Sequence, residues 1–215
     1  MAASLDYDSW HNTELTMMVV IASDSRSKMI QSAALLFREN GYSGTGFRDV
    51  VAHSGAPRGS IYHHFPGGKE QLAADTVAWA ADVIERRIQR ATKSGDPIAA
   101  LDMFVESWRE ILEDSAFHAG CPVVAVAVEA HAGSAATSAA AEAFTRWQDL
   151  IAKSLLDAGV GRAEARRLAT LVIAGVEGAI LLSRARRDIR PLRDVHRALE
   201  ETLQTAISPH GRADR

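Results

Sequence analysis

Apolar side chains recur along most of this chain at the spacing of a single helix face. Ile30, Ala33, Ala34 and Phe37 follow the i, i+3, i+4, i+7 pattern of an amphipathic helix that ends at Gly41. The same period returns in five longer segments, at 69–92, 97–118, 135–158, 163–187 and 191–207. Glycine or proline separates most of these segments, so the pattern predicts an all-α fold of successive helices.

Two segments are apolar over more than a single helix face. The run 123–128 would suit a strand by composition alone. The sequence has no second strand pattern to pair with it, so we expect a short buried helix beginning at Pro122. The segment 163–187 is apolar nearly all round from Leu168 to Leu182, which predicts a helix buried on every side.

The segment 45–72 is predicted to contain two short helices and the start of a third. Phe47 and Val50 lie on one turn of apolar face, and Thr45 is the expected N-cap of that first helix. Gly55 then breaks the chain. A second helix is expected to open at Pro57 and to bury side chains at positions 61 and 65, which is the spacing of a helix-turn-helix.

The second helix presents polar residues on its outer side. At about 100° per residue, Gly59, Ser60 and His63 lie opposite the apolar side chains, with Tyr62 and His64 flanking them. A glycine weakens a helix, so its place on an outward face suggests that a rigid object, such as the edge of a DNA groove, approaches the backbone there.

These residues resemble the DNA-binding signature of TetR-type transcriptional regulators. The matching positions are 41–42, Thr45, 47–52, 54–55, 59–62, 64–65, Lys69 and Leu72. The run APRGSIYHHFPGGKEQLA is similar to the LmrA/YxaF-type subgroup in particular, because three residues separate its His-Phe pair from the lysine. The stretch 120–124, GCPVV, is also similar to that subgroup.

The resemblance implies an organisation and a set of roles. We expect a disordered extension over 1–23, a three-helix DNA-binding domain over 24–70 and an effector-binding and dimerisation domain over 71–215. The implied protein is a homodimeric repressor that binds double-stranded DNA at an inverted repeat. The implied phosphate anchors are Thr45, Tyr62, His64 and Lys69, and the expected base readers are Arg58, Ser60 and His63.

Composition and charge are compatible with a DNA-binding regulator but do not by themselves indicate one. The net charge of −3 does not itself suggest a nucleic-acid partner, although residues 24–70 hold six basic side chains against four acidic ones. The single cysteine excludes an internal disulfide and favours a reducing compartment. The apolar run 15–22 is too short to span a bilayer, so we expect a cytoplasmic protein without a membrane partner.

The second half of the chain supplies candidates for an effector site and a dimer interface. Large or apolar side chains that could line a pocket for a small apolar or aromatic effector are Phe104, Trp108, Phe117, Cys121, Val124, Val128, Phe144 and Trp147. The alternative is that they form an ordinary core. Candidates for a dimer interface through the last two long helices are Gly175, Gly178, Ala179, Leu199 and Leu203.

The sequence gives little support for a metal site or a catalytic site. His118, Cys121 and His131 do not have the spacing of a metal or nucleophile signature, so no catalytic residue, metal or cofactor is expected. The arginine run 184–193 is interpreted as a solvated surface. The main rival function is a ligand-binding interaction protein with a non-functional DNA-binding head, and an enzyme built around Cys121 ranks third.

Overall fold

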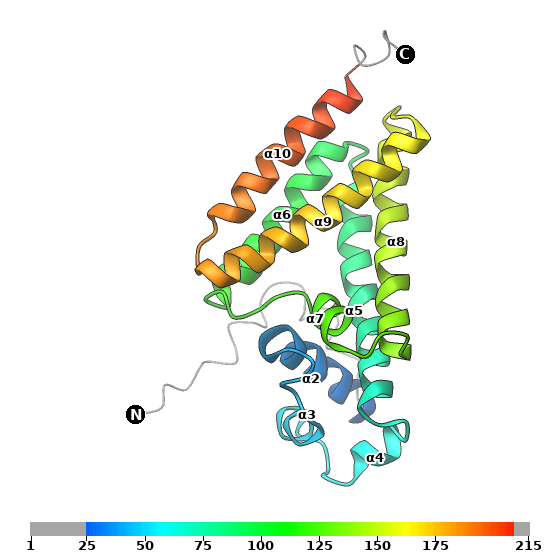
Figure 1. The fold of residues 1–215 in the computed structure, drawn as a ribbon, viewed down its shortest axis with the longest axis vertical. Helices are drawn as coiled ribbons and strands as arrows, with labels where there is room; N and C mark the ends of the chain where they lie inside the picture. The colour runs from blue at the N-terminus through cyan, green and yellow to red at the C-terminus, as the bar shows by residue number, and fades with distance from the viewer. Residues whose placement is uncertain (1–24, 209–215) are drawn as a thin grey trace.

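The computed structural model describes residues 25–208, and within that range the regular structure is entirely α-helical (Figure 1). The helices are α2 Ser25–Asn40, α3 Phe47–Ser54, α4 Ser60–His64, α5 Gly68–Thr92, α6 Pro97–Asp114, α7 Pro122–Glu129, α8 Ala135–Asp157, α9 Arg162–Arg186 and α10 Arg190–Ile207. The all-α prediction is confirmed. The extension expected over 1–23 lies outside the described residues.

Helices α2, α3 and α4 form a small head at one end of the molecule (Figure 1). Phe37 of α2, Val50 of α3, and Ile61 and Phe65 at α4 are all nearly inaccessible to solvent. These are the inward positions that the apolar spacing predicted. These side chains belong to the hydrophobic core that continues into the rest of the molecule, and their burial fixes how α3 and α4 pack on α2.

Helix α5 connects the head to the rest of the molecule. Its first turns pack against α2, and most of its length packs against α8. Trp147 of α8 is buried, and its indole N–H donates a hydrogen bond to the carbonyl oxygen of Ala81 at 3.2 Å. At 25 residues α5 spans about 37 Å, so one rigid element reaches from the head deep into the body. The boundary predicted at residues 70 and 71 would fall in its first turn.

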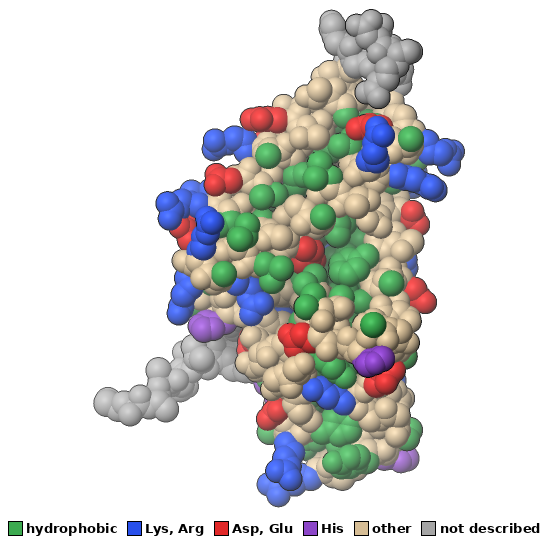
Figure 2. Space-filling view, viewed as in Figure 1, with side chains coloured by type: hydrophobic (Ala, Val, Ile, Leu, Met, Phe, Trp, Pro, Cys, Tyr) green, Lys and Arg blue, Asp and Glu red, His purple; other side chains and the backbone are tan. Residues whose placement is uncertain are grey.

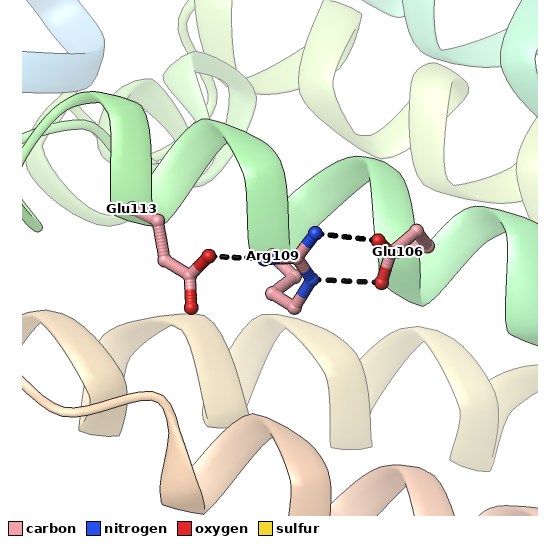
Figure 3. Close-up of polar contacts among 3 residues, drawn as sticks. All are labelled: Glu106, Arg109 and Glu113. Carbon is pink, nitrogen blue, oxygen red and sulfur yellow. Dashed lines mark hydrogen bonds and ion pairs between the residues drawn. The ribbon is translucent and has the colours of Figure 1, made fainter.

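Helices α6 to α10 complete the body around α5 (Figure 1). Helix α6 begins where Pro97 occupies the first turn and the Asp96 carboxylate accepts a hydrogen bond from the Ile98 N–H at 2.8 Å. Arg109 lies between two carboxylates of the same helix (Figure 3). It forms ion pairs with Glu106, at 2.6 Å, and with Glu113, which keep this face of α6 polar.

Two of the helix predictions are wrong in detail. The second helix of the head begins at Ser60 rather than at Pro57, because 57–59 form a turn in which the Ser60 N–H donates to the Pro57 carbonyl oxygen. Helix α9 is not buried on every side, since Leu171, Leu181 and Leu182 are exposed. By length and composition α9 could cross a membrane, but in this fold it packs against α6, α8 and α10.

Candidate nucleic-acid interface and ligand hollows

The turn between α3 and α4 gives the head its functional geometry. Gly55 caps α3 in the left-handed conformation, with φ of 65°, which glycine adopts without strain. The Ala56 N–H then donates to the Ser54 hydroxyl at 3.3 Å, and five residues separate the end of α3 from the start of α4. Two helices joined in this way form the predicted helix-turn-helix.

The outer face of α4 is open to solvent. Tyr62 is 68% exposed, and its ring meets the edge of Phe47 at 5.5 Å between centroids. Arg58 and His63 are also exposed. Gly59 has ordinary backbone angles, φ −83° and ψ −16°, and a Cβ placed there would meet no atom within 4 Å. Neither backbone conformation nor packing within the chain therefore requires glycine at this position.

Three other residues predicted to contact DNA already make contacts within the chain. The Ser60 hydroxyl donates to the Pro57 carbonyl oxygen at 2.7 Å. The ring of His64 makes T-shaped contacts with those of its sequence neighbours His63 and Phe65, at 5.3 and 6.5 Å between centroids. The ammonium group of Lys69 lies 4.4 Å from the centre of the Tyr42 ring, and partial burial lowers the pKa of Lys69.

Thr45 differs from its predicted role as a helix cap. The N-cap of α3 is Gly46, whose N–H donates to the Asp49 carboxylate at 2.7 Å. Thr45 is buried, and its hydroxyl donates to the carbonyl oxygen of Gly41 at 2.9 Å. The side chain therefore closes the loop after α2, and its hydroxyl is not directed at solvent. Its assignment as a phosphate anchor gains no support from this geometry.

The predicted pocket residues do not line one common cavity. Phe104 lines one hollow and Trp108 another. Trp147 is buried in the α5–α8 contact, where its ring meets that of Phe144 at 5.4 Å. Val128 is 76% exposed on α7. Phe117 and Val124 are partly buried against the core, and Cys121 is fully enclosed.

Among the described residues, one hollow lies inside the body and another lies between the head and the body. The distal one, about 420 Å³ including its open side, is enclosed almost wholly by apolar side chains of α5, α6, α8, α9 and α10, among them Phe104 and Leu203. The second, about 460 Å³ on the same measure, lies where α2, α5 and α6 meet the loop before α7. We call it the junction hollow. It includes Trp108 and, unlike the distal one, also Arg38 and Arg87. These two arginines were not singled out in the sequence, because arginine on a helix ordinarily marks a solvated face.

Cys121 has a partner that the sequence did not indicate. Its thiol is hydrogen-bonded to the carboxyl group of Glu177 on α9, and burial raises the pKa of both groups, that of Glu177 to about 7. A raised thiol pKa makes Cys121 a poor nucleophile. His118 and His131, which were weighed beside it, are both exposed.

A second cluster of polar groups joins α6 to α10. Asp102, His196 and Glu200 have potential ligand atoms within 4.8 Å of one another, and the His196 Nε2 lies 2.7 Å from the Asp102 carboxylate. That contact already accounts for the arrangement as a hydrogen bond between the two helices.

Four of the five residues predicted for the dimer interface pack inside the single chain. Leu199, Leu203 and Ala179 are buried, and a Cβ on Gly175 would meet Val195 and Leu199 of α10 at about 3.3 to 3.5 Å. Gly178 alone among them faces open space. The exposed apolar positions of this region lie on α9 instead, at Leu171, Ala174, Leu181, Leu182 and Ala185. Figure 2 shows hydrophobic side chains gathered over α9 on the face it draws.

Contacts between head and body were not anticipated from the sequence. The Arg184 guanidinium of α9 donates to the His118 carbonyl oxygen at 2.9 Å and to the Glu39 carbonyl oxygen, at the end of α2, at 3.4 Å. The interpretation of 184–193 as a solvated surface is therefore wrong for Arg184. The Gly120 N–H also donates to the Arg38 carbonyl oxygen at 2.8 Å. The end of α2 is thus held by groups from the body.

Sequence comparison agrees with this geometry. Residues 29–76 match the profile of bacterial regulatory proteins of the tetR family, and residues 97–198 match the C-terminal domain of LmrA/YxaF-like transcriptional regulators. The chain is 40% identical over 193 residues to the HTH-type transcriptional regulator Rv0196 of Mycobacterium tuberculosis, covering 87% of this chain and 98% of that one. It is 33% identical over 183 residues to the HTH-type transcriptional regulator LmrA of Bacillus subtilis, covering 84% and 97%.

The fold also has close counterparts among solved structures. The regulatory protein TetR from Rhodobacter sphaeroides superposes with a TM-score of 0.75 over 82% of this chain and 97% of its own, at 24% identity. Head and body thus match the same kind of protein, a DNA-binding transcriptional regulator rather than an enzyme. The chain belongs to the TetR family of bacterial transcriptional regulators, with a C-terminal domain of the LmrA/YxaF-like type.

Proposed function

We propose that this regulator is a cytoplasmic homodimeric repressor, released from an inverted-repeat operator when a small apolar or aromatic effector binds in its body. The observation that carries the proposal is the course of α5, which packs on α2 in the head and on α8 in the body. A ligand that moves the body end of α5 must also move the head. Two heads in a dimer would bind DNA only at a fixed separation, so a small displacement is costly.

The exposed surface of α4 supports the DNA-binding roles of its residues. Arg58 and His63 are free to meet base edges, and Tyr62 stands outward where a phosphate contact would be made. The open space over Gly59 would admit a groove edge to the backbone. Lys69, held over Tyr42, lies at the start of α5, where backbone N–H groups also favour an anion.

The exposed apolar surface of α9 supports the dimer. Leu171, Leu181 and Leu182 would be buried if α9 packed against its equivalent in a second copy, and Gly178 and Ala174 would allow close approach. The interface proposed here is thus the outer side of α9, in place of the Leu199 and Leu203 stripe expected from the sequence.

A DNA-binding titration tests the proposal. Fluorescence anisotropy with DNA from the protein's own upstream region should show specific binding, and Arg58→Ala should reduce the preference for that DNA over random DNA. Tyr62→Ala should weaken binding to both DNAs alike. If the wild-type protein bound neither DNA at low salt, the head would be non-functional and the rival interpretation as a ligand-binding interaction protein would hold.

A further inference from the structure

The junction hollow combines cationic and aromatic groups at the contact between head and body. Arg38 comes from the last turns of α2, whereas Trp79 and Arg87 come from α5 and Trp108 from α6. Gly120 and Pro122 also line it. All other lining residues are apolar. A ligand here would touch the head, the connecting helix and the body at once.

The charge in this hollow is of one sign. Arg38 and Arg87 are its two ionisable lining residues, and Arg38 is only 8% exposed. Burial, and then the neighbouring charge of Arg87, lowers the pKa of Arg38 to about 10. Both arginines also make contacts within the chain. A bound anion would therefore accept hydrogen bonds from only some of their N–H groups. Two guanidinium groups in a low-dielectric site favour a bound carboxylate, which can accept two parallel hydrogen bonds.

Trp108 adds a hydrogen-bond donor without an acceptor. The residue is 3% exposed, and its buried indole N–H has no hydrogen-bond partner in the part of the chain that the structure describes. Leaving such a donor unpaired is costly, so native structures rarely do so without a ligand or water. The aromatic rings of Trp79 and Trp108 line the hollow together with aliphatic groups, and such a lining suits a flat ring.

We propose that the junction hollow binds a small aromatic carboxylate, its carboxylate held by Arg87, Arg38 and the Trp108 N–H and its ring lying against the apolar wall with Trp79. This rests on the proposed ligand response and narrows the effector to an anion. The distal hollow, which offers almost no polar surface, suits a neutral molecule instead.

Binding in the junction hollow would act directly on the head. The Arg38 carbonyl oxygen accepts the Gly120 N–H at 2.8 Å, so the end of α2 and the loop before α7 are already linked beside the hollow. A carboxylate that bridges Arg38 of α2 to Arg87 of α5 would fix the angle between these helices. That angle determines where α3 and α4 lie relative to the body.

The test compares two probes of similar shape, 1-naphthoate and the neutral 1-naphthalenemethanol. Isothermal titration with the full-length protein should give at least about tenfold tighter binding of naphthoate, since charged hydrogen bonds are the stronger ones. Arg87→Gln, which alters a half-buried side chain, should remove that advantage and leave the neutral probe within about twofold. The control is Arg90→Gln, an exposed arginine one turn further along α5, which should change neither. Trp108→Phe keeps a ring, removes the N–H and should weaken naphthoate severalfold.

Equal affinities for the two probes, or equal effects of Arg87→Gln and Arg90→Gln, would overturn the proposed site. DNA binding is measured on the same samples, with and without naphthoate. Normal DNA binding without a naphthoate site would reject this inference and leave the regulator intact. Naphthoate bound at Arg87 without any change in DNA affinity would uphold the site and reject the proposed release mechanism.

Discussion

The carboxylate of Glu129, at the end of α7, accepts a hydrogen bond from the backbone N–H of Ser43 at 2.7 Å. Ser43 lies in the loop between α2 and α3, so this bond joins the body to the segment that carries the DNA-binding helices. The other carboxylate oxygen lies 2.6 Å from where a Cβ of Gly41 would stand, which fits a glycine with φ of 79° at that position.

Glu129→Ala should loosen the loop while the head stays folded. Because the Ser43 N–H loses its acceptor, amide exchange over 41–46 should become faster, and the free energy of unfolding should fall by about 1 kcal/mol. Exchange measured by mass spectrometry checks this, with the exposed Glu142→Ala on α8 as the control. Unchanged exchange over 41–46 would mean that the Glu129 contact does not hold the loop in solution.

Gly59 and Gly161 form a matched pair for testing close approach of DNA. Each is the N-cap of its helix with negative φ, and a Cβ on either would meet no atom within 4 Å. Gly59→Leu and Gly161→Leu should therefore both fold, with unfolding free energies within about 1 kcal/mol of the wild type. In an anisotropy titration with operator DNA, Gly59→Leu should lose at least about tenfold in affinity and Gly161→Leu should not. Equal DNA affinities for the two variants would contradict a groove edge at Gly59.

Much of the fold could be predicted because the ends of its helices are marked by residues at or next to them. Gly41 ends α2 with a positive φ, and Pro97 and Pro122 stand at the starts of α6 and α7. The inward face of the head followed from Ile61 and Phe65, four residues apart. Each of these signals acts within one or two helical turns, so the sequence displays it directly.

The sites were harder to predict because they depend on which helices meet. Leu199 and Leu203 belong to a clear apolar stripe, and both are buried in the single chain. The sequence pattern alone does not show whether such a stripe packs against its own chain or against a second copy. Arg38 and Arg184 look like surface residues in the sequence, yet the fold places one beside a hollow and the other against the carbonyl of His118. Such pairings join residues tens of positions apart, and helix periodicity carries no information about them.

Glu177 should make the stability of the body depend on pH. Burial raises its pKa from 4.5 to about 7, with the Cys121 hydrogen bond acting in the opposite direction. The folded protein therefore keeps this proton when the unfolded chain has lost it. The unfolding free energy should fall as pH rises from about 4.5 to about 7, by on the order of 2 to 3 kcal/mol.

Urea denaturation at pH 5 and pH 8 measures this dependence. Glu177→Gln, which cannot ionise, should lose that part of the pH dependence and be more stable than the wild type at pH 8. The exposed Glu142→Gln should behave as the wild type at both values. If Glu177→Gln and the wild type lost the same stability between pH 5 and pH 8, the carboxyl group would not be the source.

Leu181 and Leu203 distinguish a surface for a second copy from the interior of one chain. Leu181 on α9 is 51% exposed, whereas Leu203 on α10 is almost fully buried and lines the distal hollow. Leu181→Asp should therefore give a folded monomer, because the charge cannot be desolvated at an apolar α9–α9 contact. That monomer should bind operator DNA far more weakly, since one head covers half a site.

Leu203→Asp should instead lower the unfolding free energy by several kcal/mol, by placing a charge inside the chain. Light scattering after size exclusion gives the assembly state, and circular dichroism with a thermal scan gives the folding state. A dimeric Leu181→Asp with normal DNA binding would exclude the outer side of α9 as the interface.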